Sequence, residues 1–537
     1  MKLFKNLQIS STKFIFFLSI YLGFVLNAAF FKTLFSNFEL SSVFHFLCLF
    51  FLCVIVPLPL FAFLNMILVK RTIKFLSCLI LLISSGTNYI MFKMGVHLDR
   101  SMMANVFETN LRESMELISL PLVLNVLILG VIPALLICKT KIRFSSFKVE
   151  FIRRSCSIGI SVLVVLAYLL VFGKFAIPFA RNYREIRSQY NTLNYIMNTT
   201  RYVIKVIKTP KHFTILDENP KSVPSSKNVH VFVLVVGETA RTKNFSLYGY
   251  EKETNPLLKK EKNLVVVDKA TSCGTSTAIS VPCMFSSKNR SHFDKSKASY
   301  EENLLDIVKK AGWDVVWLEN DDGCKGVCDR VEYHDIVASN DSKDCFGDFC
   351  RDEALMPYLD NTLKNITKNT VIVLHTMGSH GPAYYKRYPK EFEKFKPACD
   401  TANIQDCTND ELVNTYDNTI LYTDYIISKV INSLKAYKNY ETSLLYLSDH
   451  GESLGEGGLY LHGMPYKIAP DEQKNVPFFM WFSDKALKGL HMKLECLKNT
   501  VFENPSHDNL FHTVLGITET KTKLYDPKLD LISYCRQ

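Results

Sequence analysis

The chain has 537 residues, of which 48% are hydrophobic and 21% are charged, and its mean hydropathy is +0.07. This composition is too apolar for a chain of soluble domains alone, and it excludes disordered and fibrous proteins. Residues 1–200 contain 20 Lys and Arg against 7 Asp and Glu, whereas the rest of the chain contains 43 against 45. Because the soluble-looking part is nearly neutral, nucleic-acid binding is excluded as its function.

Apolar segments with almost no charge dominate the first third of the chain. They cover residues 14–31, 43–68, 75–92, 117–138 and 158–173, and each is long enough to cross a bilayer as a helix. No small-residue cleavage site follows the first segment, so it is predicted to remain as an anchor. A cleaved signal peptide is the alternative.

Basic residues lie on one side of these five segments. They are Lys2, Lys5, Lys13, Lys70, Arg71, Lys74, Lys139, Lys141, Arg143, Lys148, Arg153 and Arg154. The positive-inside rule makes that side cytoplasmic. Five crossings then place everything after about residue 174 on the outer side of the membrane.

The cysteines support this topology. Ten of the 15 lie in the C-terminal part, and eight of these form close pairs. The pairs are Cys273 with Cys283, Cys324 with Cys328, Cys345 with Cys350 and Cys399 with Cys407, and the distant Cys496 and Cys535 remain for a fifth. Such pairs predict disulfides formed in an oxidising compartment. A structural zinc site is the alternative for Cys324 and Cys328.

The sequence predicts three regions. Residues 1–174 form a transmembrane domain of five helices, and residues 175–228 an amphipathic interfacial helix followed by a linker rich in Lys, Pro and Ser. Residues 229–537 form a compact domain. In the outer loop at 93–116, Asn105, Thr109 and Glu113 are spaced by four and share one helix face, which the sequence alone reads as a solvated polar face.

The C-terminal region alternates apolar, β-branched runs with helical patterns. Strands are predicted at 229–237, 314–320, 369–378 and 442–451. Helices are predicted at 302–312, ending at Gly312 as a C′ glycine would end it, and at 411–435. This alternation predicts an α/β fold with a largely parallel sheet. Active-site residues in such sheets gather beyond the carboxyl ends of the strands.

Several predicted strands end in groups that bind metals. The first leads to Glu238, the third to His375 and His380, and the fourth to Asp449 and His450, with His462 twelve residues later. Carboxylates and imidazoles that converge on one sheet edge suit zinc. His375, inside a strand end, has a structural role as an equal alternative.

A hydroxyl-rich segment, ATSCGTSTAISVPCMFS at 270–286, leads into a predicted helix. A hydroxyl at a helix N-terminus faces backbone N–H groups that favour phosphate, and contact with zinc would make it a nucleophile. The composition does not choose among Ser272, Thr275, Ser276 and Thr277. A Ser/Thr-rich turn without catalytic function is the alternative.

Six blocks resemble the phosphoethanolamine transferases that modify lipid A and confer polymyxin resistance, members of the alkaline phosphatase and sulfatase superfamily. The blocks are GETARTKNFSLYGYEKETNP (237–256), TSCGTSTAISVPCMFS (271–286), HTMGSHGPAYYKRYP (375–389), TYDNTILYTDY (415–425), SDHGESLGEGGLYLHG (448–463) and SHDNLFHTVLG (506–516). The resemblance spans nearly the whole chain. It implies a five-helix transmembrane domain followed by a C-terminal α/β domain of alkaline phosphatase and sulfatase type.

The resemblance also implies roles for individual residues. Glu238, Thr277, Asp449 and His450 correspond to the ligands of the catalytic zinc, and Thr277 to the nucleophile. His380 and His462 line the same site in the family and hold a second zinc or the transferred group. Asn105, Thr109 and Glu113 correspond to residues near the donor head group, and Lys325 to a lysine that contacts the substrate.

The implied reaction is a double displacement between lipids. Thr277 takes phosphoethanolamine from phosphatidylethanolamine, and a lipid A phosphate then accepts it from the threonine, with His380 or His462 handling protons. The family places such enzymes in the bacterial inner membrane as multi-pass proteins, in contact with membrane lipids, with the catalytic domain in the periplasm. We expect a monomer whose activity lowers outer-membrane negative charge and gives resistance to polymyxin and cationic peptides.

The main alternative is a transferase of the same superfamily with another acceptor, such as a core sugar, a protein glycan or a glycerol-phosphate polymer. A sulfatase is disfavoured because SVPCMFS lacks the C/S-x-P-x-R pattern that formylglycine formation requires. A membrane sensor with a degenerate catalytic fold is disfavoured because every implied ligand is present.

Overall fold

The computed structural model describes residues 8–536 apart from residues 39, 99, 109–113, 116, 183–185, 187, 210, 340 and 347–348. Lys2, Lys5, Thr109 and Glu113, named above, therefore lie outside the described residues. The chain forms two compact units, one of Met1–Met103 with Ile118–Val203 and one of Ala104–Leu117 with Ile204–Gln537. The helices α6 (Arg100–Glu108) and α12 (Asn191–Lys208) carry the chain from the first unit into the second.

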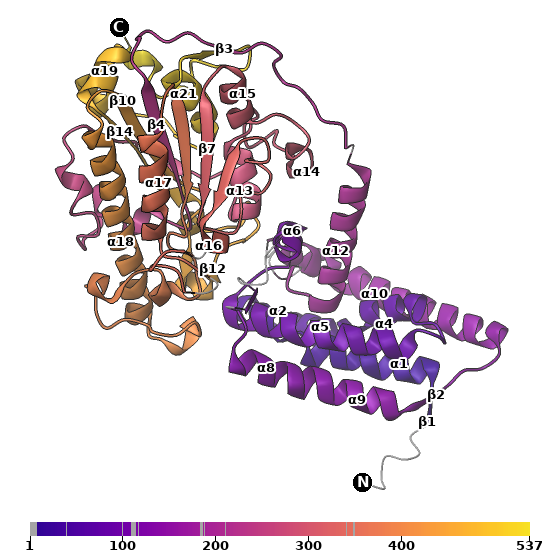
Figure 1. Cartoon of the computed structure of the whole chain (residues 1–537). Helices are drawn as coiled ribbons and strands as arrows, with labels where there is room; N and C mark the ends of the chain where they lie inside the picture. The colour runs from indigo at the N-terminus through magenta and orange to yellow at the C-terminus, as the bar shows by residue number, and fades with distance from the viewer. Residues whose placement is uncertain are drawn as a thin grey trace. The chain divides into compact units, whose positions relative to one another are not determined.

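The first unit is helical (Figure 1). Its helices are α1 (Ser11–Ile20), α2 (Ala28–Asn37), α3 (Val43–Ile55), α4 (Pro57–Ile67), α5 (Ile73–Met94), α8 (Leu120–Val126), α9 (Ile132–Lys139) and α10 (Phe147–Asn182). Two π-helical turns, Tyr21–Val25 and Leu127–Val131, extend α1 and join α8 to α9. A short parallel pair, β1 (Gln8–Ser10) and β2 (Lys141–Arg143), completes the unit.

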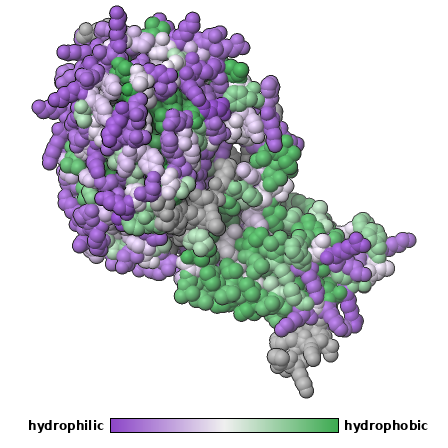
Figure 2. All heavy atoms as spheres, viewed as in Figure 1, coloured by the Kyte–Doolittle hydropathy of each residue, from purple (hydrophilic) through white to green (hydrophobic). Residues whose placement is uncertain are grey.

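Within the described residues, four helical stretches are long and apolar enough to cross a membrane: Val43–Ile67, Ile73–Met94, Leu120–Lys139 and Phe147–Ile177. A fifth span is formed if the pair Ser11–Val25 and Ala28–Asn37, bent by 55°, counts as one. Large apolar side chains stay exposed on these helices, and Figure 2 shows the surface of this unit as mostly hydrophobic. The predicted membrane segments are confirmed as these helices, the first of them bent.

Buried amides satisfy the backbone where the first span bends. The side-chain amide of Asn191 donates to the carbonyl oxygens of Leu26 and Ser84, at 2.8 and 2.9 Å. The side-chain oxygen of Asn27 accepts from the backbone N–H of Asn191 at 2.8 Å. Without Asn191, the Leu26 carbonyl oxygen at the bend would lack this partner in apolar surroundings, at a cost on the order of several kcal/mol.

The second unit is built on a seven-stranded sheet, and all four predicted strands are confirmed. In spatial order the strands are β5 (Leu264–Val266), β14 (Phe478–Phe482), β10 (Glu441–Ser448), β4 (His230–Gly237), β9 (Thr370–His375), β7 (Asp314–Glu319) and β8 (Glu332–Asp335). The five from β10 to β8 are parallel, and β14 runs antiparallel to both of its neighbours, β10 and β5. The uninterrupted apolar sequence of β4 reflects burial on both of its faces.

Helices cover both faces of this sheet (Figure 1). On one face, α13 (Thr277–Met284), α15 (Leu304–Lys310) and α21 (Asp508–Ile517) pack in the main hydrophobic core, and α17 (Leu355–Lys364) and α18 (Asn409–Ala436) lie on the other. Capping boxes start α15 at Asn303 and α18 at Thr408. Gly312, at φ +107°, ends α15 in the left-handed conformation that the sequence predicted.

Short elements complete the second unit. They are β3 (Lys221–Ser222) paired with β15 (Thr520–Lys521), β6 (Ala270–Thr271) with β13 (Asn475–Val476), β11 (Ser453–Leu454) with β12 (Tyr460–Leu461), and α14 (Lys295–Ala298), α16 (Ile336–Ser339), α19 (Asp484–Gly489) and α20 (Leu494–Asn499). All five predicted cysteine pairs form disulfides in this unit. The disulfide between Cys324 and Cys328 removes the thiolates that a structural zinc site would need.

Candidate metal and nucleophile site

Strand register brings the first two carboxylates together. Gly237 of β4 pairs with Ser448 of β10, so the residues that follow them, Glu238 and Asp449, leave the sheet side by side. Gly378, at φ +50°, lets the loop after β9 approach, because a Cβ there would lie 2.6 Å from the carbonyl oxygen of Glu238. The site therefore lies at the carboxyl edge of the parallel strands, as the sequence predicted.

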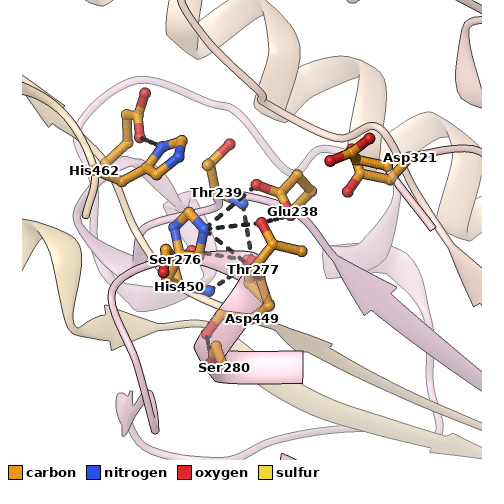
Figure 3. A network of polar contacts seen from close by, with 12 residues as sticks. Glu238, Thr239, Ser276, Thr277, Ser280, Asp321, Asp449, His450 and His462 are labelled. Carbon is orange, nitrogen blue, oxygen red and sulfur yellow. Dashed lines mark hydrogen bonds and ion pairs between the residues drawn. The ribbon is translucent and has the colours of Figure 1, made fainter. Parts of the chain in front are cut away.

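Thr277 enters this edge as the first residue of α13 (Figure 3). The disulfide between Cys273 and Cys283 closes the chain around it. One turn into the helix, the hydroxyl of Ser280 donates to the backbone carbonyl of Asp449 at 2.5 Å. These links hold the start of α13 against the end of β10.

Four buried side chains meet at this point. The hydroxyl of Thr277 donates to Glu238 Oε2 at 3.1 Å and lies 3.4 Å from His450 Nε2. The same nitrogen lies 3.5 Å from Glu238 Oε1 and 3.3 Å from Asp449 Oδ2. Glu238, Asp449 and His450 are completely buried, and Thr277 is nearly so.

The other hydroxyls of the Ser/Thr-rich segment have partners elsewhere. Ser272 donates to the carbonyl oxygen of Gly274, and Thr275 to that of Met464. Ser276 donates to the side chain of Asn105 at 2.9 Å. Among the four candidates that composition left open, Thr277 is the residue whose hydroxyl donates to the carboxylate cluster.

The donor atoms of this cluster fit a cation. Asp449 Oδ1 accepts from the backbone N–H groups of Thr239 and His450, at 3.2 and 2.6 Å. Glu238 Oε1 and Asp449 Oδ2, in contrast, are buried without a hydrogen-bond partner. His450 Nδ1 donates to the carbonyl oxygen of Gly451 at 2.9 Å, so Nε2 turns its lone pair toward these two oxygens. Facing lone pairs repel each other unless a cation lies between them.

The charges of the buried groups also favour a cation in this cluster. Burial raises the pKa of Glu238 well above its usual range, and the charges of Asp449 and Asp321 raise it further. Burial likewise raises the pKa of Asp449 to about 7, a rise to which Asp321 adds and which His375 opposes. Burial and the neighbouring His462 lower the pKa of His450 well below its usual range. A divalent cation offsets the carboxylate charges and needs the neutral imidazole as a ligand.

Two more predicted histidines lie beside the cluster. The ring of His462 is 4.4 Å from that of His450 and 5.6 Å from that of His380, measured between centroids. His462 Nδ1 donates to Glu452 at 2.8 Å, and Glu452 also accepts from the hydroxyl of Tyr384. This second contact fixes the carboxylate that orients His462.

A second group lies next to Glu238 and is formed by Asp321 and His375. The sequence analysis named His375, with a structural role as an equal alternative, and missed Asp321. Asp321 follows the end of β7, and His375 ends β9, where it pairs in register with Glu319. Both side chains are buried. The rule that located Glu238 and Asp449 would have found Asp321 too, had the polar end of β7 been included.

The predicted substrate-binding residues are only partly described. Asn105 of α6 accepts from Ser276, next to Thr277, whereas Thr109 and Glu113 are outside the described residues. Lys325 lies in the loop closed by Cys324 and Cys328, and its ammonium group donates to the carbonyl oxygen and a carboxylate oxygen of Asp322 at 2.6 and 2.7 Å. The roles of these residues stay predictions.

Comparison with known proteins connects the site to a family. The family model "Sulfatase" matches residues 230–520, and the model "Phosphoethanolamine transferase EptA/EptB" matches residues 56–206. Phosphoethanolamine transferase EptA of Escherichia coli K12 is 39% identical over 100% of this chain and 99% of its own length. Phosphatidylethanolamine transferase Mcr-1 of E. coli is 34% identical over 86% of this chain and 85% of its own length.

A solved structure agrees over the full length. The integral membrane lipooligosaccharide phosphoethanolamine transferase A (EptA) of Neisseria meningitidis superposes with a TM-score of 0.96 and is 38% identical, covering 99% of this chain and 100% of that one. Both domains of the fold are thus accounted for, an apolar helical membrane part and a soluble sulfatase-type part. The chain belongs to the EptA family of phosphoethanolamine transferases and is a membrane-bound enzyme of that family.

Proposed function

We propose that this enzyme transfers phosphoethanolamine from phosphatidylethanolamine to a lipid A phosphate through a phosphoethanolaminyl-threonine intermediate on Thr277. The observation that carries the proposal is the hydroxyl of Thr277, which starts α13 and donates to Glu238 among buried metal-ligating groups. The acceptor is supported by the meningococcal relative, whose name specifies lipooligosaccharide. The donor is supported by the relative named a phosphatidylethanolamine transferase.

Glu238, Thr277, Asp449 and His450 would hold the catalytic zinc. Two carboxylates, a neutral imidazole and a hydroxyl form a donor set that suits zinc, and the unpartnered oxygens of Glu238 and Asp449 are available for it. When bound, zinc would lower the pKa of the Thr277 hydroxyl and offset negative charge on the phosphoryl oxygens.

In the first half-reaction, Thr277 Oγ1 attacks the phosphorus of phosphatidylethanolamine. The O–H bond of Thr277 breaks and its proton moves to Glu238 Oε2, which accepts the existing hydrogen bond. The bond from phosphorus to the diacylglycerol oxygen breaks as the Oγ1–P bond forms. His380 or His462 gives a proton to the diacylglycerol oxygen, which then departs as an alcohol.

In the second half-reaction, an oxygen of the lipid A phosphate attacks the same phosphorus, and the Oγ1–P bond breaks. Thr277 recovers its proton from Glu238, and the histidine recovers one from the hydroxyl of the acceptor phosphate. Glu452 keeps His462 oriented through both halves. We assign Asn105, Thr109, Glu113 and Lys325 to substrate binding, with Asn105 placed next to the nucleophile through Ser276.

The cellular setting is part of the proposal. Residues 1–174 would span the bacterial inner membrane, and residues 229–537 would form the catalytic domain in the periplasm. Residues 175–228 would connect these two domains. Five disulfides in the second unit suit an oxidising compartment. A monomer that adds phosphoethanolamine to lipid A would reduce its negative charge and so give resistance to polymyxin and other cationic peptides. A core sugar, a protein glycan or a glycerol-phosphate polymer is the alternative acceptor.

Mass spectrometry of lipid A from a Gram-negative host tests the proposal. We expect a phosphoethanolamine adduct with the wild-type enzyme and none with Thr277→Ala, since loss of a nucleophile lowers turnover by about 10,000-fold or more. Ser272→Ala removes another hydroxyl of the same segment, one that donates to the carbonyl of Gly274, and is expected to keep the adduct. An adduct formed by Thr277→Ala would refute the nucleophile. If well-expressed wild-type enzyme gave no adduct, lipid A would be refuted as the acceptor.

A further inference from the structure

A second group of metal-ligating atoms lies next to the proposed catalytic ligands and shares only Glu238 with them. Glu238, Asp321 and His375 each offer one ligand atom, and the three atoms lie within 4.8 Å of one another. The three side chains are 0, 6 and 0% exposed. In Figure 3, Asp321 and His450 lie on different sides of Glu238.

The orientation of His375 is fixed by a carboxylate. His375 Nδ1 lies 2.9 and 3.0 Å from the two oxygens of Glu319 and donates to them. Glu319 in turn accepts from the indole N–H of Trp317 at 2.8 Å and from the backbone N–H of Asp321 at 2.7 Å. A histidine that donates one ring nitrogen to a carboxylate and presents the other to an ion is a recurrent arrangement in metal sites.

The other ring nitrogen of His375 points into the group. His375 Nε2 is buried without a hydrogen-bond partner, as is Glu238 Oε1. Nε2 lies 3.8 Å from Asp321 Oδ2. That distance is too long for a hydrogen bond. It suits two ligands of one ion, because ligand atoms about 2.0–2.2 Å from a zinc ion can be almost twice that distance apart.

An ion pair without a metal accounts for the geometry less well. A protonated ring would place an N–H at Nε2, where no acceptor lies within hydrogen-bond distance. A buried N–H without an acceptor costs about 1–3 kcal/mol. A cation instead uses both unpartnered atoms.

We propose that Glu238, Asp321 and His375 bind a second divalent cation of the zinc class, with Glu238 shared between this ion and the proposed catalytic one. One imidazole and two carboxylates suit first-row divalent metals. The second ion would anchor Glu238 from the side opposite Thr277. This site goes beyond the proposed reaction, and it does not depend on the identity of the acceptor.

The test measures bound zinc in the full-length enzyme, purified in detergent, loaded with ZnCl2 and desalted. We expect Asp321→Asn and His375→Gln each to bind one zinc ion fewer than the wild-type enzyme. Asp449→Asn should lose a different ion, so the double variant Asp321→Asn with Asp449→Asn should bind two fewer. Asp424→Asn, at a buried carboxylate that caps backbone N–H groups elsewhere, is the matched control and should bind as many as wild type.

The outcomes separate this site from the proposed catalytic one. Wild-type zinc content in both folded Asp321→Asn and folded His375→Gln would overturn the second site. Wild-type zinc content in Asp449→Asn alone would overturn the catalytic ligand set and leave the second site standing. Folding of each variant is checked by thermal melting followed by tryptophan fluorescence, because Trp313, Trp317 and Trp481 all lie in the second unit.

Discussion

His230, at the start of β4, makes the stability of the second unit sensitive to acid. Its side chain is buried, Nε2 is 2.8 Å from the hydroxyl of Ser443, and its ring lies 5.6 Å from that of Trp313. Burial, aided by the charge of Arg536, lowers the pKa of His230 from 6.5 to about 3. The folded enzyme therefore keeps this ring neutral at pH values where the unfolded chain protonates it.

The sign and size of the effect follow from that difference. Since the unfolded state binds more protons between the two pKa values, stability falls as pH drops from 6.5 toward 3. At pH 4.5 the folded ring is neutral and the unfolded ring is two pH units below its pKa. Two units correspond to about 3 kcal/mol of lost stability from this one residue.

The assay is urea unfolding of the detergent-solubilised enzyme at pH 7 and pH 4.5, followed by tryptophan fluorescence. All three tryptophans lie in the second unit, so the signal reports that unit alone. Between pH 7 and pH 4.5, we expect the free energy of unfolding to fall by about 3 kcal/mol less in His230→Gln than in the wild-type enzyme. His334→Gln, at a partly exposed histidine, is the matched control and should behave as wild type. Equal pH dependence in wild type and His230→Gln would refute the reasoning.

Two further predictions concern the backbone and the disulfides. Gly378→Ala should reduce phosphoethanolamine transfer by more than about 10-fold, because its Cβ would displace Glu238 from the nucleophile. Gly457→Ala, with a similar positive φ but open space around it, should keep transfer, and equal losses would show that backbone strain alone is responsible. Replacing Cys496 and Cys535 by Ala should lower unfolding free energy by about 2 kcal/mol more than replacing Cys324 and Cys328, because the disulfides close loops with sequence separations of 39 and 4. Urea midpoints measure that difference, and equal destabilisation would contradict it.

The strand ends could be predicted from sequence because each proposed ligand follows an apolar run that ends in polar residues. Glu238, Asp449 and His450 needed only that pattern and the rule that parallel strands end at one edge. The spatial order of the strands in the sheet, however, could not be predicted. β9 lies between β4 and β7, and this order, with Glu319 in register with His375, creates the second group. A single sequence does not reveal which strands become neighbours.

The nucleophile shows a similar limit. Four hydroxyls within six residues have the same chemistry in sequence, and only the turn before α13 separates Thr277 from Ser276. Family resemblance selected Thr277, and the direction of its hydroxyl toward Glu238 supports that choice. The edge strand β5 and its neighbour β14 were missed because they are short and pair antiparallel, without the helix-strand alternation used to find the others.

The pairing of β4 with β10 also sets when the active centre can first exist. Thr239 and Asp449, joined by a hydrogen bond, are 210 residues apart in the chain. At about 5–20 residues per second, synthesis of that interval takes roughly 10–40 s. Until then β4, the middle strand of the finished sheet, lacks β10, one of its two neighbours, and Glu238 lacks Asp449 and His450 beside it. Loading of the proposed zinc site would therefore be a late event in the synthesis of the chain, and a chain truncated before β10 would lack two of the proposed ligands.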